Sequence, residues 1–446
     1  MKKQNGLLGL KDLLLKQFLF DDKSSDSVPD SLPAKERDRR KSPMGASFVN
    51  TVDFEAVDLD AIMSLEISSS KIVAMIGVLN TRKEIEILGF GQQILKNTDD
   101  NEVIKMAAAI RSAVSEAIEL SGVTHVKAVY TNYSGTLCIN RLTEVHIKED
   151  LAEEITLQDI EILKEQMYPV ISPPGEETML IQLEHYTIDD LPNILNPVGM
   201  VGKWIEASFR AVGGDVSILR NLRKCISRAD LHLTSAFPSA IASAEAVLLE
   251  EEKEGSIAII DIGASMTHIA VFENGLFIYA ETLKIGSNSV SQDIQQFTGL
   301  NFEKAEMIKR ACNSLNPQNV SEDDVIQVDL FLGRKRVTIS ARELAYVIEA
   351  RVEELVSLAY SKVVASLDGL KPDLGIVITG GGVALLPDIE KFVKQLTGVR
   401  CYVGRPDIHL APDTGLPAHL FALMKSPVYA TSVGLLNMGL NGRYYC

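Results

Sequence analysis

One pattern occurs twice in this chain and limits the folds that it can adopt. It consists of an apolar run that ends in an acidic residue, a turn of small residues, and a second apolar run. The first copy reads LEISSSKIVAMIG from Leu65 to Gly77, and the second reads IDIGASMTHIAVF from Ile260 to Phe272. Short apolar runs separated by small turn residues are typical of buried strands joined in hairpins. Two such copies predict two related halves that face each other across a cleft.

Each copy also predicts a third strand. Turn residues at positions 80–83 precede the apolar run Ile85–Phe90 in the first copy. In the second copy the Asn274-Gly275 pair, a strong hairpin signal, precedes the run Leu276–Ala280. Each half is therefore expected to begin as an antiparallel meander rather than as a strand followed by a helix.

A further strand with a glycine turn follows late in the chain. The apolar run Leu374–Thr379 ends in the three glycines at 380–382, and Pro387 opens a predicted helix. Three consecutive glycines would let a flat ring, such as adenine, lie close to the backbone. The patterns GxGxxG and GxxxxGK[ST] do not occur, which argues against dinucleotide-binding and P-loop folds.

The two hairpin turns have the composition of a phosphate site. Gly, Ala, Ser and Thr leave backbone N–H groups and hydroxyls unobstructed for phosphate oxygens. The acidic residues that precede the turns, Glu66 and Asp261, could hold a hydrated Mg²⁺ that neutralises phosphate charge. The alternative is that each turn is an ordinary tight hairpin whose acidic residue caps local N–H groups.

The composition excludes several other functions. A net charge of −16 over 446 residues argues against a nucleic-acid partner, because nucleic-acid-binding proteins normally carry a basic stripe. The five cysteines are scattered without a CxxC pair, which is typical of a reducing cytoplasm and offers no zinc site. No run approaches the ~18 apolar residues of a membrane-spanning helix.

The N-terminus differs from the rest of the chain. Residues 1–20 contain nine Leu or Phe side chains, four lysines and one acidic residue, which predicts an amphipathic segment that lies on an anionic membrane surface. A helix that docks in a protein groove and a secretory signal are the alternatives. Residues 21–56 predict a flexible linker. Residues 1–45 carry ten Lys or Arg against seven Asp or Glu, so their net charge is +3 and the remainder carries −19.

Several passages resemble the FtsA family of bacterial cell-division proteins, within the actin-like ATPase superfamily, over residues 58–440. Both acid-tipped hairpins resemble its phosphate loops, and the passage YTIDDLPNILNPVGMVGKWIE resembles a segment that other actin-like branches lack. The remaining passages are FEKAEMIKR from Phe302, VITGGGVALLPDIEKFV from Val377 and PVYATSVGLL from Pro427.

The resemblance implies an α/β, actin-like fold with two pseudo-symmetric lobes around a nucleotide cleft. Residues 57–126, 210–254 and 427–446 would form the first lobe, and residues 127–209 an FtsA-type inserted subdomain that touches the next subunit of a polymer. Residues 255–426 would form the second lobe. Within it, residues 291–339 would form a small subdomain that receives the C-terminal peptide of FtsZ.

The resemblance also implies a set of site residues. The contacts to the phosphates of ATP would be Ser68, Ser69, Ser70, Lys71, Gly263, Ala264, Ser265, Met266 and Thr267. The contacts to the adenosine would be Glu306, Lys309, Gly380, Gly381 and Gly382. Glu66 and Asp261 would be Mg²⁺ partners that act through bound water. Arg336, Arg342 and Arg351 would be the basic contacts of the FtsZ peptide, with ordinary helix-surface charge as the alternative.

The sequence departs from the family pattern in three respects: the first phosphate loop, the second phosphate loop with the strand that follows it, and the membrane anchor. Ser68 replaces a glycine of the first loop, and the second loop reads Gly263-Ala264-Ser265 where three glycines are usual. His268 stands where an aspartate is usual. These changes predict weak ATP binding with little or no hydrolysis, and no residue identifies itself as a catalytic base. The third departure is that family members usually end in a basic amphipathic helix, so residues 1–20 are expected to act as the anchor instead.

Three functions are consistent with these observations. The leading one is an ATP-binding adaptor that polymerises on the inner face of the cell membrane at the division site and recruits FtsZ filaments. A pilus-assembly scaffold with an actin-like fold is the second. A small-molecule kinase of the same superfamily is the third, although a kinase needs a carboxylate that accepts the proton of the substrate hydroxyl.

Overall fold

The structure is a computed structural model that describes residues 60–95, 102–123, 125–148, 154–167, 174–330, 335–412 and 416–442. All of them belong to one compact unit, Leu59–Cys446. The predicted membrane segment at 1–20 and the predicted linker at 21–56 lie outside the described residues. No helix among the described residues is long and apolar enough to cross a membrane.

The first lobe is built on a mixed sheet with the strand order β3-β2-β1-β4-β9. β1 (Ile62–Ile67), β2 (Lys71–Leu79) and β3 (Ile85–Ile94) form the antiparallel meander that the sequence predicts. β1 then pairs in parallel with β4 (Ala128–Tyr133), and β4 pairs in parallel with β9 (Ser235–Pro238). The acidic residue at the tip of β1 therefore lies on a central strand of the sheet.

The second lobe repeats this arrangement with the order β12-β11-β10-β15-β16. β10 (Ile257–Ile262), β11 (Thr267–Glu273) and β12 (Leu276–Leu283) form the meander. β15 (Gly375–Thr379) and β16 (Cys401–Val403) continue the sheet in parallel. Because both sheets have the same order and the same strand directions, the predicted internal repeat is confirmed.

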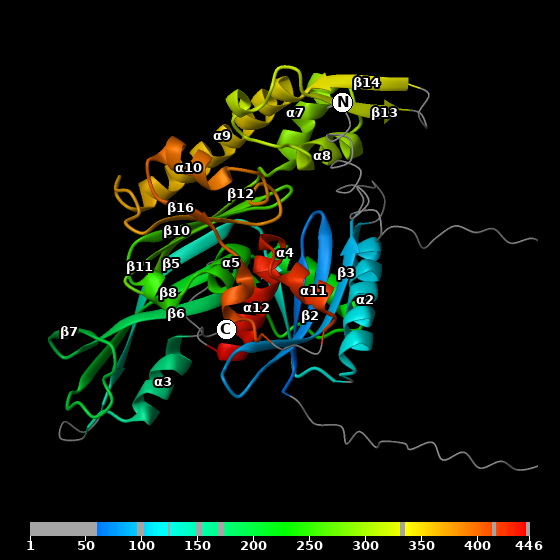
Figure 1. The fold of residues 1–446 in the computed structure, drawn as a ribbon. Helices are drawn as coiled ribbons and strands as arrows, with labels where there is room; N and C mark the ends of the chain where they lie inside the picture. The colour runs from blue at the N-terminus through cyan, green and yellow to red at the C-terminus, as the bar shows by residue number, and fades with distance from the viewer. Residues whose placement is uncertain are drawn as a thin grey trace, which may run out of the picture. The chain divides into compact units, whose positions relative to one another are not determined.

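Two helices cross between the sheets and join the lobes. α5 (Ser239–Val247) follows the first sheet but packs on β10, β11 and β12 of the second, whereas α12 (Ala430–Asn441) packs on β1, β2 and β4 of the first. Figure 1 shows the two helices side by side at the centre of this unit. Their contact is close because a Cβ atom on Gly434 would lie 1.7 Å from the carbonyl oxygen of Ala242.

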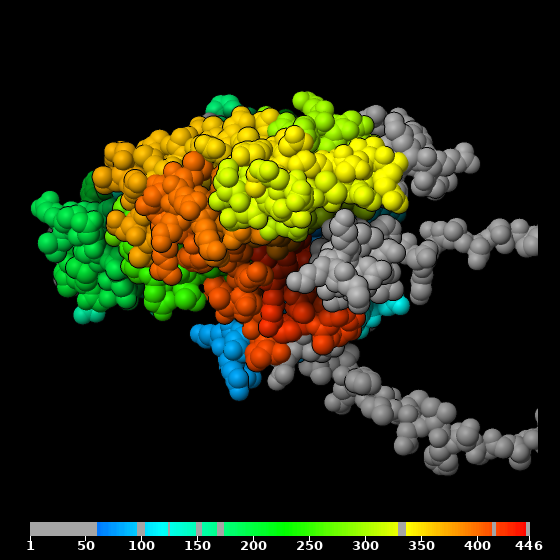
Figure 2. Space-filling view, turned by 45° about the horizontal axis from the view of Figure 1, so that its top comes forward, coloured from blue at the N-terminus to red at the C-terminus, as the bar shows by residue number. Residues whose placement is uncertain are grey.

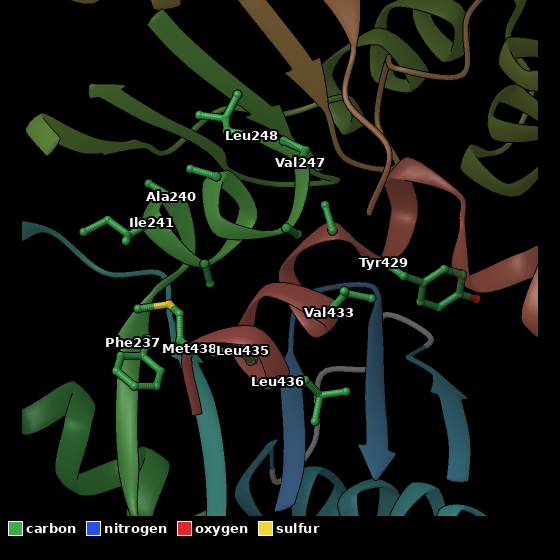
Figure 3. Packing of buried hydrophobic residues seen from close by; sticks show 14 of the residues in the cluster. Phe237, Ala240, Ile241, Val247, Leu248, Tyr429, Val433, Leu435, Leu436 and Met438 are labelled. Carbon is green, nitrogen blue, oxygen red and sulfur yellow. The ribbon is translucent and has the colours of Figure 1, made fainter. Parts of the chain in front are cut away.

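Apolar side chains from both lobes form one core around this crossing. Phe237 and Ile241 approach it from β9 and α5, while Val433 and Leu436 approach it from α12 (Figure 3). Each of these side chains is nearly or completely buried, and full burial of a side chain of this size contributes about 1.5–3 kcal/mol. The two lobes are therefore held together by shared hydrophobic packing.

The insertion between β4 and β9 carries a separate antiparallel sheet with the order β5-β8-β6-β7. Its strands are β5 (Leu137–Ile147), β6 (Glu176–Ile188), β7 (Leu191–Ile194) and β8 (Trp204–Asp215). α3 (Leu157–Met167) packs against β5. The predicted insertion ends at Phe209. The observed sheet extends further, to Asp215 at the end of β8.

The other boundary of the insertion also differs from the prediction. β4 falls inside the range 127–209 that the sequence assigns to the insertion, yet it pairs with β1 along Ile62–Leu65 in the first sheet. Its sequence, AVYTNY, mixes apolar and polar residues and does not reveal which sheet it joins. Only the long-range pairing with β1 places it.

The small subdomain of the second lobe lies between β12 and α9 (Ala341–Ser366). It contains α7 (Asn288–Thr298), α8 (Phe302–Arg310) and an antiparallel hairpin of β13 (Val325–Leu330) and β14 (Lys335–Ser340). Figure 2 shows the yellow segments of this region at the surface, beside the orange segment that contains α10.

The remaining elements connect these parts of the fold. They are α2 (Glu102–Ser121), α4 (Val216–Ser227), α6 (Glu250–Lys253), η2 (Pro317–Asn319), α10 (Ile389–Thr397), η3 (Pro406–His409), α11 (Ala418–Met424) and η4 (Pro427–Tyr429).

A methyl group at position 434 should separate the crossing helices. We expect Gly434→Ala to lower the free energy of unfolding by at least about 2 kcal/mol, because the added Cβ would overlap the backbone of α5. Chemical denaturation of the full chain measures the change. Gly213→Ala is the matched control, since its Cβ would lie 3.4 Å from the nearest neighbour, an ordinary contact. Equal stability of both variants would contradict this account of the crossing.

Candidate functional site

The acidic residue at the end of β1 is buried and fully engaged. Glu66 is 5% exposed. Its Oε1 lies 2.8 Å from the ammonium nitrogen of Lys71, and its Oε2 accepts a hydrogen bond from the Ser432 hydroxyl of α12. A buried carboxylate needs such partners because removal from water disfavours its charged form.

The first hairpin turn is closed by its own hydrogen bonds. The backbone N–H of Ser68 donates to the carbonyl of Lys71 at 3.0 Å, and the Ser68 hydroxyl donates to the same carbonyl at 2.9 Å. The carbonyl of Ser70 accepts a bond from the N–H of Leu95. Ser69 is exposed at the tip, so its hydroxyl and backbone face the solvent.

The acidic residue at the end of β10 has a parallel environment. Asp261 is 5% exposed, and its Oδ2 accepts hydrogen bonds from the hydroxyls of Ser243 on α5 and Thr431 on α12. Burial raises the pKa of Asp261, although the two hydroxyls and the nearby Lys71 ammonium oppose this effect. The charge of Lys71, a residue of the first lobe, thus acts on an acid of the second.

Both acids meet at the first turn of α12. Thr431 and Ser432 are consecutive residues, and they contact Asp261 and Glu66 respectively. The N-terminus of a helix carries a partial positive charge, which favours anionic groups. The first turn of α12 therefore joins the predicted acid-tipped hairpins at one place in the molecule.

The second hairpin turn and the glycine loop pack against each other. A Cβ on Gly380 would lie 2.2 Å from Asp261 Oδ1, and a Cβ on Gly382 would lie 2.4 Å from the carbonyl of Ile262. Glycine is thus required at both positions by the protein's own backbone. Gly381 is exposed, and a Cβ there would lie 3.4 Å from Val428.

The start of α7 supports the second turn from the other side. The N–H of Ser287 donates to Gly263, the N–H of Asn288 donates to Ala264, and the Asn288 side chain donates to the hydroxyl of Ser265. Within the turn, the N–H of Gly263 donates to the carbonyl of Met266. The turn is therefore held in a fixed shape, with residues 263–266 only partly buried.

Thr267 fixes the beginning of the returning strand. Its hydroxyl donates to the carbonyl of Ile285 at 2.8 Å, and its side chain is buried. This hydrogen bond therefore ties the residue that follows the second turn to the segment after β12.

The buried Lys309 and the partly exposed Glu306 form an ion pair beside α7. Lys309 Nζ lies 2.7 Å from Glu306 Oε2 and donates to the carbonyl of Ser287 at 3.2 Å. Burial lowers the pKa of Lys309 and would raise that of Glu306. For Glu306, however, Lys309, the Ser291 hydroxyl and Arg310 outweigh burial and hold the pKa below its usual value. The pair links α8 to the residue that supports the second turn.

His268 is a neutral residue of the cleft. It lies directly across the strand pair from Asp261 and is 8% exposed. Burial lowers its pKa to about 4, and the charge of Glu66 opposes this only in part. Its Nδ1 lies 3.2 Å from the hydroxyl of Thr282. At neutral pH it therefore adds no charge to the site.

The donor chemistry suits a polyphosphate better than a metal ion. Small-residue turns, serine hydroxyls and one lysine match the needs of phosphate oxygens. By contrast, the described residues contain no group of three or more His, Cys, Asp or Glu side chains placed to hold a metal. The carboxylate oxygens of Glu66 already serve Lys71 and Ser432. A Mg²⁺ bound directly by Glu66 and Asp261 does not fit this arrangement, and their predicted role through bound water stays a prediction.

Val428 of η4 lies beside both the first turn and the glycine loop. The Lys71 ammonium donates to the carbonyl of Val428 at 2.9 Å, and Val428 also lies beside Gly381 of the glycine loop. Hollows of about 370 and 350 Å³ lie on the second lobe, lined by Asp388, Lys391 and their neighbours. Neither hollow is lined by a residue of the two turns.

The three arginines predicted to bind the FtsZ peptide differ in their surroundings. Arg351 makes a two-pronged ion pair with Asp293 of α7, at 2.5 and 3.0 Å, and also contacts Glu354. Arg342 donates to the carbonyl of Val320 and pairs with Glu322, which is largely exposed.

Arg336 is exposed on β14, where one of its guanidinium nitrogens lies 3.3 Å from Gln327 Oε1. Of the three arginines, Arg351 is the one with a clear structural task, since its ion pair ties α9 to α7. Arg336 is exposed, whereas the side chains of Arg342 and Arg351 have nearly equal exposure, 26% and 27%.

The sequence did not indicate every residue of the site. Ser243, Thr431 and Ser432 hold the two acids, and Asn132 binds both the N–H and the carbonyl of Ile67 at the base of the first turn. The small and hydroxyl residues in SAIASAEAV and ATSVGLL were the available signal, because such residues allow helices to approach closely.

The comparisons with known proteins agree with this architecture. A family model described as "Cell division protein FtsA" matches residues 258–434, and a model described as "SHS2 domain inserted in FTSA" matches residues 135–212. The cell division protein FtsA of Neisseria meningitidis serogroup B is 28% identical over 384 residues, covering 84% of this chain and 88% of that protein. The FtsA of Escherichia coli K12 is 27% identical over 404 residues, covering 87% and 93%.

A solved structure with a TM-score above 0.5 shares the fold at lower identity. A chain of the PilM-PilN type IV pilus biogenesis complex superposes with a TM-score of 0.58 at 16% identity, covering 85% of this chain and 98% of that chain. MreB5 of Spiroplasma citri bound to ADP has a TM-score of 0.46 at 13% identity, covering 85% and 95%. The predicted fold, an actin-like α/β fold with two lobes and an inserted SHS2 subdomain, is confirmed.

The buried His268 should make stability depend on pH. An unfolded histidine has a pKa near 6.5, so between about pH 6.5 and pH 4 the unfolded chain binds a proton that the folded chain does not. Stability is therefore lost as the pH falls through this window. Between pH 7 and pH 4.5 we expect the wild type to lose about 2 kcal/mol more than His268→Gln, measured by denaturant unfolding. Equal losses in the two proteins would show that His268 is protonated in the fold.

Proposed function

Because this chain belongs to the FtsA family of cell-division proteins, we propose that it is an ATP-binding adaptor that polymerises on the inner face of the cell membrane. There it tethers FtsZ filaments during assembly of the division septum. The observation that carries the nucleotide part of the proposal is the meeting of Glu66 and Asp261 at the first turn of α12. This contact brings the two small-residue turns of the lobes to one cleft.

The proposed nucleotide site uses the chain's own donors. Ser69 and the partly buried turn at residues 263–266 face the phosphates, and Lys71 supplies the positive charge. Glu306, Lys309 and the glycine loop at 380–382 lie toward the adenosine. Bound ATP would supply phosphate charge that draws the two turns together, so that binding favours one subunit conformation over another. No residue is assigned as a catalytic base.

The inserted subdomain is the proposed contact to the next subunit of a polymer. Apolar side chains are exposed near its tip, among them Leu191 (61%), Leu195 (81%) and Val201 (61%). Exposed apolar patches of this kind are typical of interaction surfaces. They lie on β7 and in the passage before β8, which includes the NPVGMVG segment.

The small subdomain is the proposed receptor for the C-terminal peptide of FtsZ. Arg336 and Arg342 would contact the acidic part of the peptide. The partner of Arg342, Glu322, is 83% exposed, and an exposed ion pair costs little to exchange. Arg351 would act differently, because its ion pair with Asp293 positions α9 against α7.

Residues 1–20 are the proposed membrane anchor. Their leucines, phenylalanines and lysines suit an anionic lipid surface, and the charged, proline-containing residues 21–56 would separate the anchor from the folded unit. The likeness to a pilus protein is one of fold alone, and no specific observation favours the pilus or kinase alternatives.

Cosedimentation with FtsZ and anionic liposomes tests the adaptor proposal. The full chain should carry FtsZ filaments into the liposome pellet. Deletion of residues 1–20 should leave both proteins in the supernatant, because the anchor is lost. Arg342→Glu should pellet normally but carry about tenfold less FtsZ, since like charge would repel the acidic peptide.

Lys394→Glu, an exposed charge reversal on α10, is the matched control and should carry FtsZ as the wild type does. Unchanged pelleting after the deletion would reject the anchor. Equal recruitment by Arg342→Glu and the control would reject the proposed peptide contact.

A further inference from the structure

The ammonium of Lys71 occupies a built site in the cleft. Its nitrogen lies 2.8 Å from Glu66 Oε1, 2.9 Å from the carbonyl oxygen of Val428, and 4.8 Å from the centre of the Tyr429 ring. The Lys71 side chain is only 11% exposed. A carboxylate, a carbonyl and an aromatic face are the three kinds of group that bind a cation in a desolvated place.

The aromatic wall of this site is itself held in place. The Tyr429 hydroxyl donates to Gln92 Oε1 at 2.6 Å, and its ring packs edge-on against Phe90 with centroids 5.6 Å apart. Tyr429 ends η4, directly before α12. Residues of β3 and η4 thus keep the ring under the ammonium, so that the cation site is preorganised.

The two acids leave little for a second cation to bind. Glu66 uses one oxygen for Lys71 and the other for Ser432, while Asp261 accepts from Ser243 and Thr431. A magnesium ion retains several of its waters and requires octahedral geometry, so it needs room as well as oxygens. At Glu66 the Lys71 ammonium already holds Oε1.

The charged groups of the site are few. Glu66 and Asp261 are the acids, Lys71 is the cation, and His268 is neutral. Lys71 acts on both acids, since it contacts Glu66 and its field reaches Asp261. A divalent ion bound to Glu66 Oε1 would have to displace the Lys71 ammonium, which lies 2.8 Å from that oxygen, because like charges repel strongly at such distances.

We propose that Lys71 is the resident cation of this site and takes the place of Mg²⁺, so that nucleotide binds here without a divalent metal. The proposal rests on the proposed nucleotide-binding function. The ammonium balances one of the two acidic charges in the free protein and is the cation available to phosphate oxygens at the turns. Removal of this charge should create a requirement for Mg²⁺ that the wild type does not have.

Two measurements on the full-length protein test this proposal. The first is titration with a fluorescent ATP analogue in Mg²⁺ and in EDTA. The wild type should bind with affinities that agree within about threefold. Lys71→Met should bind at least about tenfold more weakly in EDTA than in Mg²⁺, because the metal then supplies the missing charge.

The second measurement is thermal unfolding with and without Mg²⁺, in the absence of nucleotide. The wild type should not respond to the metal, whereas Mg²⁺ should raise the Tm of Lys71→Met by about 2 °C or more. Lys83→Met is the matched control, since it makes the same change in the exposed turn between β2 and β3 and should behave as the wild type.

The outcomes separate this proposal from the proposed function. If the wild type binds no nucleotide under either condition, the proposed nucleotide function fails, and the thermal measurement still decides the role of Lys71. A wild type that loses at least about tenfold in affinity in EDTA, or that Mg²⁺ stabilises, would overturn the proposal. Failure of Mg²⁺ to stabilise Lys71→Met would also overturn it. If that variant does not fold, Lys71→Gln replaces it in both measurements.

Discussion

The close crossing of α5 and α12 is the contact on which the rest of this structure depends. Each helix belongs by chain order to one half of the repeat and packs on the sheet of the other half. The absence of a side chain at Gly434 lets the helix backbones touch at Ala242. This contact fixes the position of the first turn of α12 relative to both sheets. Because Thr431 and Ser432 lie in that turn, the acidic ends of β1 and β10 are brought to the same place.

The electrostatics of the cleft follow from this geometry. Two carboxylates with 5% exposure would be costly without partners, and the helices provide them as three hydroxyls from α5 and α12. Lys71, which belongs to the first hairpin itself, balances one of the two negative charges. The site therefore has few charged side chains, and it combines buried acids with partly exposed turns.

Local features of this structure could be predicted from the sequence, whereas features that depend on distant packing could not. The hairpins were predictable because their turns and apolar runs are contiguous in the chain, as the positive φ angles of Asn274 and Gly275 illustrate. The position of β4 was not, since only its pairing with β1 distinguishes it from the insertion. Likewise, the sequence shows Arg351 as one basic residue among several. Its partner Asp293 lies on a different helix, and only the fold brings the two together. The partners of Glu66 and Asp261 were missed for the same reason. Ser432, for example, lies 366 residues after Glu66 in the chain.

The central claim is that the turns at residues 68–71 and 263–266 form one nucleotide site across the cleft. Hydrogen–deuterium exchange of the full-length protein, with and without ATP, tests this claim most directly. The account predicts that ATP slows exchange in both turns over the same concentration range. Slower exchange in only one turn, or in neither at saturating ATP, would contradict it.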